Sequence, residues 1–530
     1  MVTDQEARGA WSSKAGFLLA AAGSAIGLGN IWRFTYIMGE NGGAAFILVY
    51  VACIILIGVP LFLAELVLGR NTHLNPVGAI KAIKPGTSWK WIGALGVLAG
   101  AFLLSFYSVV AGWVMAYALR APFGTISGLA SPEEAGTYFG ALSSSASQSL
   151  MFHGLFMVAT VVIVARGIKG GIERASKIMM PILFILLVAL AVRSMTLTGA
   201  GAGIDFMLRP DFSALTPTVV LIAMGHAFFT LSVGMGTMIT YGSYLTPEHN
   251  LPMASLQVAF MDTLIAIVAG FAIFPALFAF GMEPSEGPGL VFVTLPVVFH
   301  QMPGGMLFAS MFFALFFMAA LTSSISLLEV VAAYFIDELG WLRSKAVLVL
   351  GVAIFLMGIP AALAMGSWGG WSIASMLGAT AGQGALGSVG ILQLNWFDLI
   401  SHIVSDYMLP VGGFFLCLLV GWFWNRATVE AEVFIGSPGF RFMTLWINLL
   451  RWFGPLLIGQ VLVLGILAEF PSLAQLVDTL QAWFAGLDIL VALAVIVVTL
   501  VELERRVAEL EGRIEEAAVG GKTRPAEFRD

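Results

Sequence analysis

The sequence predicts an all-α integral membrane protein with twelve transmembrane helices, built as a 5+5 inverted repeat in which helices 1 and 6 are broken. Three observations predict this class. The 530-residue chain is 59% apolar and 11% charged, with a mean hydropathy of +0.95, whereas a soluble domain of this size needs far more charge on its surface. Twelve apolar runs have the length of a membrane span, and glycine-rich stretches interrupt the first and the sixth.

The spans follow from run length, because a helix needs roughly 20 apolar residues to cross a bilayer. The stretch 288–304 is apolar but short and broken by Pro and Gly, so we expect a re-entrant or surface hairpin there. The predicted spans lie near residues 12–36, 43–68, 90–120, 148–166, 177–197, 217–243, 254–281, 305–335, 346–365, 399–424, 444–468 and 480–502.

Loop charges predict the orientation, because positively charged loops stay in the cytoplasm. The 7–8 and 9–10 connections carry no Lys or Arg, and the second of these, about 368–394, is an unusually long outer loop. The 2–3 and 4–5 connections carry the cations Arg70, Lys81, Lys84, Lys90, Arg166, Lys169, Arg174 and Lys177. We therefore expect a protein of the inner cell membrane with both termini in the cytoplasm.

The two terminal segments are expected to lie in the cytoplasm. Segment 1–10 is polar and lacks the pattern of a cleaved signal peptide, so we expect it to remain as a cytoplasmic segment. Residues 506–530 are expected to form a cytoplasmic tail that begins as a helix. Cys53 and Cys417 both lie inside apolar runs, which argues against a disulfide framework.

Glycines in the middle of two spans predict breaks in those helices. Residues 23–30 read GSAIGLGN and residues 231–237 read LSVGMGT. Glycine weakens a helix by about 1 kcal/mol relative to Ala and lets the backbone leave helical geometry. Non-helical backbone at membrane depth must line a cavity or be buried in protein, which places a binding site at the breaks. Close helix packing at these glycines is the alternative explanation.

Several motifs resemble the neurotransmitter:sodium symporter family, in its bacterial amino-acid branch. They are GSAIGLGNIWRF and ENGGAAF in the first 46 residues, RGIKGGIERASKIMMP at 166–181, FFTLSVGMGTMITYGSY at 228–244 and LTSSISLLE at 321–329. The similarity extends from about residue 8 to 500. The resemblance implies a transporter domain over 11–505, with repeats at about 11–197 and 217–424 and helices 11–12 at about 444–505. It also implies sodium-coupled amino-acid import by alternating access.

The resemblance implies two sodium sites. The first contains the Ala25 carbonyl and the side chains of Asn30, Thr230 and Asp262. The second contains the carbonyls of Gly23, Ile26 and Ala319 and the hydroxyls of Thr322 and Ser323. Residues 319, 322 and 323 share one helix face, although the two hydroxyls could instead bond back to their own helix.

Asp262 is the informative member, since a lone charge within a span costs at least about 2.5–3.5 kcal/mol. A protonated or Arg-paired structural acid is the alternative. Animal members place Asn here and a chloride-binding Ser four residues later, where this sequence has Asp262 and Ala266. We therefore expect transport without chloride. Asp262 is also a candidate to carry a proton on the empty return stroke.

Gly27 indicates the substrate class. Monoamine-transporting relatives carry Asp at this position, so the hydrogen here implies a substrate that brings its own carboxylate, an amino acid. Met235 is flexible, which favours a broad apolar and aromatic range, although each apolar residue taken singly is typical of ordinary packing. The resemblance assigns to the substrate site Ala25, Gly27, Gly29, Leu103, Tyr107, Phe229, Thr230, Ser232, Met235, Ser324, Ser326 and Leu327.

The resemblance also implies two gates. Arg33 needs an acidic partner at the outer gate, but Ser401 stands where the family has its carboxylate. Asp398 is the nearest substitute and Asp406 the alternative. Arg33 could also extend outward to solvent without a partner. The inner gate is implied to contain Arg8 and Asp337, supported by Trp11 and Tyr244, unless the N-terminal segment is simply loose.

Two rival functions remain open from the sequence. One is a carrier for a different small amino-acid-like substrate, and the other is a substrate-sensing membrane receptor with the same fold. The chain shows no His/Cys metal cluster, nucleophile motif or phosphate loop, so we do not expect an enzyme. The expected partners are an amino acid, about two sodium ions and the lipid bilayer, with no nucleic acid. His226 and His402 receive no role, and the oligomeric state is not predicted.

Overall fold

The computed structural model describes residues 9–282, 289–377 and 389–470, with five further positions between 479 and 487. All regular structure in these residues is helical. Nine helical segments in this part of the chain are long and apolar enough to cross a membrane. They comprise α4–η2–α5 (Ala44–Thr72), α7–η3 (Lys90–Phe123), α9 (Ala146–Ala165), η4–α10 (Ile168–Met195), α14 (Leu251–Ala279), α16 (Gly305–Leu339), α17 (Arg343–Leu363), α21–η7–α22–η8 (Trp396–Phe423) and α24–η9–α25 (Met443–Ala468).

The first span is broken, as predicted. Helix α2 (Lys14–Ala25) starts at the N-cap Ser13, whose side chain accepts the Gly16 N–H, and ends where Ile26 turns to an extended conformation. After residues 26–28 the chain continues as η1 (Gly29–Arg33) and α3 (Phe34–Glu40), bent by 51° from α2. The two halves together form a tenth span.

The sixth span is broken as well. Helix α12 (Pro217–Thr230) and helix α13 (Thr237–Gly242) are separated by residues 231–236. Ser232, Gly234 and Gly236 there have φ values of 54°, 86° and 75°, a region that glycine adopts readily. A Cβ at Gly234 would lie 2.4 Å from the Leu409 carbonyl oxygen, so that position also requires glycine for space. Helix α12 is apolar but shorter than a full membrane span. The predicted span at 480–502 falls almost entirely outside the described residues.

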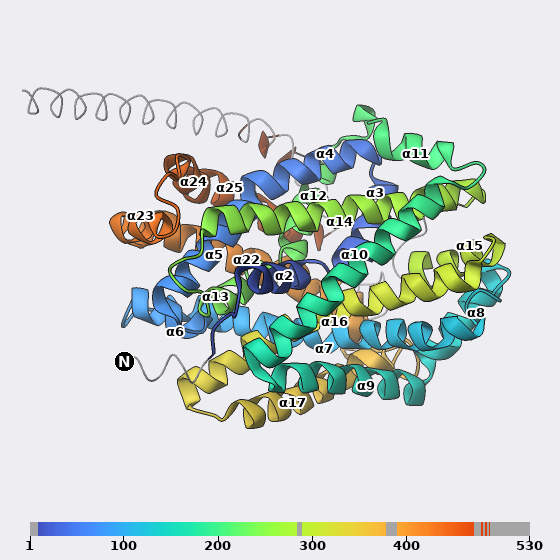
Figure 1. The fold of residues 1–530 in the computed structure, drawn as a ribbon, viewed down its shortest axis with the longest axis horizontal. Helices are drawn as coiled ribbons and strands as arrows, with labels where there is room; N and C mark the ends of the chain where they lie inside the picture. The colour runs from blue at the N-terminus through green and yellow to red at the C-terminus, as the bar shows by residue number, and fades with distance from the viewer. Residues whose placement is uncertain are drawn as a thin grey trace, which may run out of the picture.

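The long helices run side by side across the molecule, and short helices cap its two ends (Figure 1). The ends are named here the Arg33 end and the Trp11 end, after the residues beside the two halves of the first span. The shorter helices are α6 (Pro76–Ile83), α8 (Pro132–Ser144), α11 (Gly201–Leu208), η5 (Phe212–Ala214), η6 (Leu290–Thr294), α15 (Leu295–Gln301), α18 (Ile373–Met376), α20 (Gly390–Gln393) and α23 (Arg426–Phe434).

Two connections differ from the sequence expectation. The fifth span begins at Ile168, about nine residues earlier than predicted, because 168–173 already forms the π-helical turn η4. Lys169, Arg174 and Lys177 therefore lie on the first helical turns and not in a loop.

The hairpin expected at 288–304 is helical where described, as η6 and α15. The long 368–394 connection contains α18 and α20, and its residues 378–388 lie outside the described part.

Candidate functional site

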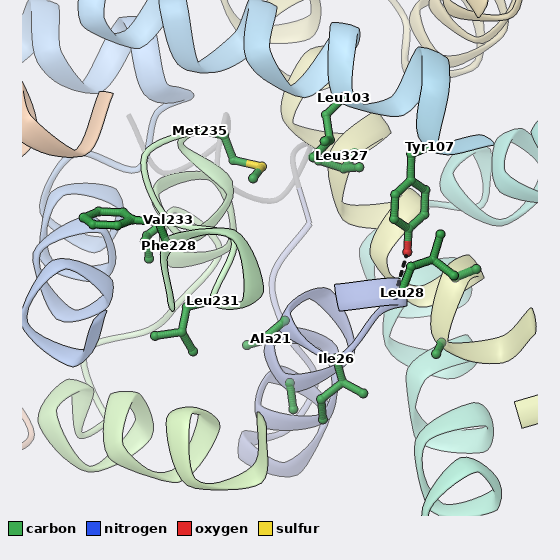
Figure 2. Close-up of a cluster of buried hydrophobic side chains, with 14 of the residues drawn as sticks. Ala21, Ile26, Leu28, Leu103, Tyr107, Phe228, Leu231, Val233, Met235 and Leu327 are labelled. Carbon is green, nitrogen blue, oxygen red and sulfur yellow. Dashed lines mark hydrogen bonds between the residues drawn. The ribbon is translucent and has the colours of Figure 1, made fainter. Parts of the chain in front are cut away.

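The breaks of the first and sixth spans meet in the interior, beside α7 and α16. A small cavity of about 20 Å³ lies there. In Figure 2, Leu103 and Leu327 lie near Met235, and the Tyr107 hydroxyl points to Leu28. The cavity is lined by Ser24, Ala25, Gly27, Leu28, Gly29, Leu103, Tyr107, Phe229, Thr230, Ser232, Met235, Ser323 and Leu327. Ten of the twelve residues assigned to the substrate site are among them.

The other two, Ser324 and Ser326, are buried behind the cavity wall. The Ser324 hydroxyl lies 2.8 Å from that of Thr160 on α9, so it links two helices and does not face the cavity. Ser326 accepts a hydrogen bond of 2.7 Å from Ser24, which does line the cavity. Sequence reasoning did not single out Ser24, because its role depends on this contact across 302 residues.

The residues assigned to the second sodium site come together where α16 meets the broken α2. The Ser323 hydroxyl lies 3.4 Å from the carbonyl oxygens of both Gly23 and Ile26, so this side chain bridges to the first span. Thr322 behaves otherwise, since its hydroxyl bonds the Ala319 carbonyl of its own helix at 3.0 Å. The structure thus shows the helix-internal alternative for Thr322 and the inter-helix contact for Ser323.

The residues assigned to the first sodium site surround a buried carboxylate. Asp262 on α14 is fully buried. Its Oδ1 accepts hydrogen bonds from the Asn30 amide at 2.7 Å and from the Thr230 hydroxyl at 2.9 Å. Its Oδ2 accepts one from the hydroxyl of Tyr50, at 3.1 Å, and Tyr50 was not predicted as a site residue. The Asn30 Oδ1 in turn accepts the Gly27 N–H at 3.0 Å.

These two clusters have the donor chemistry of a hard monovalent cation. The second combines backbone carbonyls with a hydroxyl oxygen, and the first combines a carboxylate with amide and hydroxyl groups, whereas softer metals favour sulfur and imidazole ligands. Within the described residues, no three His, Cys, Asp or Glu side chains are placed to hold a metal ion. Both clusters contain groups of the first span at or beside the 26–28 break, Gly23 and Ile26 in one and Asn30 in the other.

Glu65 on α5 fixes the unwound segment of the sixth span. It is fully buried, and its carboxylate accepts the backbone N–H groups of Gly234 at 2.7 Å and Met238 at 3.0 Å. Without these acceptors the donors freed by the break would be buried and unpaired, which costs about 1–3 kcal/mol each. A Glu inside an apolar run was the available sequence signal, and its partners could not be read from the chain.

At the Arg33 end, a second cavity of about 150 Å³ lies beyond Phe229 and Tyr107. The Arg33 guanidinium lies 4.9 Å from the Phe229 ring centroid and 3.9 Å from the Asp406 carboxylate. Asp398 instead accepts a hydrogen bond of 2.7 Å from the Asn395 side chain. Of the two carboxylates predicted for the outer gate, the structure therefore places Asp406, the second choice, opposite Arg33.

At the Trp11 end, Trp11 is fixed against α13. Its indole N–H donates to the Tyr241 carbonyl at 3.0 Å, and its ring meets that of Tyr244 edge-on. The Tyr244 hydroxyl donates to Glu329 at 2.7 Å, and Glu329 also forms a bidentate pair with Arg343. This buried pair was not predicted from the sequence.

The remaining inner-gate residues are only partly described. Asp337 accepts the backbone N–H of Asn75 at 3.0 Å, which caps the start of α6. Beside it, Lys81 and Glu338 form an ion pair of 2.6 Å that raises the pKa of Lys81. Arg8 lies outside the described residues.

Comparison with known proteins identifies the family. The profile of the Sodium:neurotransmitter symporter family matches residues 8–126 and 142–508. An uncharacterised sodium-dependent transporter of Bacillus subtilis is 41% identical over 461 residues, covering 86% of this chain and 98% of that protein. The sodium-dependent serotonin transporter of Drosophila melanogaster is 30% identical over 67% of this chain and 64% of its own length.

The fold has an equally clear relative among solved structures. The crystal structure of MhsT in complex with L-phenylalanine superposes with a TM-score of 0.77 at 45% identity, covering 86% of this chain and 99% of MhsT. The broken spans, the buried oxygen clusters and these matches agree. The chain is therefore an integral membrane protein and a sodium-dependent transporter that belongs to the sodium:neurotransmitter symporter family.

Proposed function

We propose that this protein imports hydrophobic and aromatic L-amino acids together with sodium, by alternating access and without chloride. The observation that carries the proposal is the junction at residues 26–28, where two oxygen clusters and the central cavity meet. The orientation follows from the loop cations, with the Trp11 end and both termini in the cytoplasm and the protein in the inner membrane.

Two sodium ions fit the two clusters. The first would be held by Asp262, Asn30 and Thr230 with the Ala25 carbonyl. The second would be held by the Thr322 and Ser323 hydroxyls with the carbonyls of Gly23, Ile26 and Ala319. A sodium ion at the first site would replace the hydrogens that Asn30 and Thr230 now direct at Asp262. The ion would also neutralise the charge of the buried Asp262 carboxylate, which favours an ordered conformation of the broken segment at residues 26–28.

The cavity supports an amino-acid substrate. Gly27 has no side chain, and the Tyr107 hydroxyl, which accepts the Leu28 N–H at 3.4 Å, faces this position, so a substrate carboxylate would bind beside Gly27 and Tyr107. Leu103, Met235 and Leu327 offer an apolar subsite on the other side (Figure 2). At about 20 Å³ the cavity is far smaller than phenylalanine, so Met235 and Phe229 must move when substrate binds. The phenylalanine held by MhsT supports this substrate class.

Chloride independence follows from the charge at the first cluster. Asp262 already supplies the negative charge, and Ala266 one turn along the same helix is fully buried and offers no hydroxyl. A chloride ion here would be desolvated beside a carboxylate, which is unfavourable.

The test is uptake of labelled L-phenylalanine into proteoliposomes with an inward sodium gradient. We expect accumulation that is lost when potassium replaces sodium and is kept when gluconate replaces chloride. Leu, Met, Tyr and Trp should compete, whereas Glu and Lys should not. A Gly27→Asp variant should lose uptake. Sodium-dependent binding without accumulation would instead identify a substrate sensor, and loss of uptake in gluconate would overturn chloride independence.

A further inference from the structure

His402 lies between two carboxylates at the Arg33 end, and both of its ring nitrogens face one of them. Nδ1 is 2.7 Å from Asp406 Oδ2, four residues along the same helix, and Nε2 is 2.6 Å from Glu469 Oε1 at the end of α25. The imidazole is 27% exposed, so protons from solution can reach it. Nothing in the proposed transport chemistry requires this cluster.

With Asp406 and Glu469 both ionised, the two contacts together require the charged form of the ring. A neutral imidazole has one N–H and could donate to only one carboxylate, which would leave the other facing a nitrogen lone pair. The imidazolium donates to both and balances their charge together with Arg33. The contacts of the cluster therefore depend on one proton.

The two carboxylates differ in how firmly they are held. Glu469 is 14% exposed and also accepts hydrogen bonds from Tyr407 at 3.1 Å and from the Ile391 N–H at 2.6 Å. Asp406 is 45% exposed, and its other oxygen reaches Arg33 only at 3.9 Å. When His402 is neutral, its single N–H is best used on the fixed and less exposed Glu469, and Asp406 becomes free to turn to Arg33.

We propose that His402 is a positioning residue of the outer gate, which withholds Asp406 from Arg33 when protonated and releases it when neutral. The proposal rests on the proposed alternating-access function, because it takes Arg33 and Asp406 as the outer gate of that cycle. Protonation should thus favour opening at the Arg33 end, and proton loss should favour closure.

Other titratable groups around this end do not make the same contacts. Asp398, one turn earlier, bonds Asn395. Tyr407 packs edge-on against the His402 ring and bonds Glu469. The wall of the 150 Å³ cavity includes Arg33 and Tyr36 of the first span and Tyr107 of α7. His226 of α12 lies among the rings of Phe34 and Tyr50.

The test is labelling of a cysteine behind the gate. Val110 on α7 lines the 150 Å³ cavity and is 2% exposed, so a Val110→Cys thiol should react with a membrane-impermeant thiol reagent only when this end opens. Both native cysteines are buried, which keeps the background low. The rate is measured from pH 5 to pH 9 without substrate, across the range where an ordinary imidazole titrates, about 6.5.

The labelling rate of the Val110→Cys protein is divided by the labelling rate of the Val110→Cys protein that also carries His402→Gln. This ratio removes the intrinsic pH dependence of the thiol. Loss of one half-exposed ion pair should change the labelling rate about fivefold, which corresponds to about 1 kcal/mol. The ratio of the two labelling rates should therefore be about five at pH 5 and near one at pH 9. His402→Lys places a permanent cation here, so the Val110→Cys thiol should be labelled fast at every pH. His300→Gln is the control, because the His300 ring lies 2.9 Å from the Ser127 carbonyl oxygen and its replacement should leave the profile unchanged.

A ratio that stays flat with pH would overturn the role of His402. Asp406→Asn with the same reporter tests the gate itself, and it should label fast with only the thiol's own pH dependence. If Asp406→Asn labels as slowly as the parent, the gate assignment in the proposed function fails, whatever the pH profile of His402.

Discussion

Adding one methyl group at Gly27 should weaken substrate binding strongly, because that group would collide with both halves of the site. A Cβ built there lies 2.5 Å from the Ser323 hydroxyl oxygen and 3.0 Å from the Tyr107 hydroxyl oxygen. Ser323 belongs to the proposed second sodium site, and Tyr107 faces the proposed carboxylate position. Neither oxygen can stay in place in a Gly27→Ala variant.

The magnitude follows from the cost of overpacking a close-packed interior, about 1–3 kcal/mol. If the liganded state bears that cost, the dissociation constant for L-phenylalanine rises by about 5- to 150-fold. The assay is equilibrium binding of labelled L-phenylalanine to purified protein at saturating sodium, followed by a sodium titration. Both apparent affinities should fall.

Gly100→Ala on α7 is the matched control, since a Cβ there has no neighbour closer than 3.7 Å. Thermal unfolding of both variants separates a folding defect from a binding defect. A Gly27→Ala protein that melts like the parent and binds phenylalanine and sodium with unchanged affinity would refute the proposed arrangement of the site.

Three further variants test other parts of the account. Asp262→Asn should weaken sodium binding by about 10- to 150-fold in a sodium titration, since a charged ligand is worth about 1.5–3 kcal/mol; unchanged sodium affinity would argue against the first site. Asp262→Asn combined with Ala266→Ser should make uptake respond to chloride, and uptake equal in chloride and gluconate would contradict this. Glu65→Gln should lower the thermal midpoint, because an amide group cannot accept both the Gly234 and Met238 N–H groups and unfolding should cost about 1–3 kcal/mol less; an unchanged midpoint would show that these bonds contribute little.

The sequence predicted the spans and their two breaks well, because both depend on local composition. Apolar runs set the spans, and glycines at 23, 27 and 29 and at 234 and 236 marked where the helices end. The start of the fifth span was placed too late because charged residues suggested a loop, whereas long cationic side chains on the first helical turns can reach water.

The candidate site was predicted mainly where the family motifs reach. Asp262, Asn30 and Thr230 lie together as the resemblance implied. The groups that support them are Tyr50 and Glu65, whose partners are 169 to 212 residues away in sequence. Such pairs follow from the three-dimensional packing and carry no local pattern.

The outer gate shows the same limit. Asp398 was the nearest carboxylate to the aligned position, but its side chain accepts a hydrogen bond from Asn395. Asp406, two turns further along the helix, faces Arg33 instead. The contact of His402 with Glu469 depends on where α25 ends, 67 residues later.

Equilibrium binding of L-phenylalanine in sodium and in potassium, with phenethylamine as competitor, tests the central claim most directly. Sodium at the two breaks and the groups beside Gly27 are proposed to bind the substrate carboxylate together. We therefore expect saturable binding in sodium, none in potassium, and no competition by phenethylamine, which lacks the carboxylate. Equal binding in both salts, or displacement by phenethylamine as effective as by phenylalanine, would contradict it.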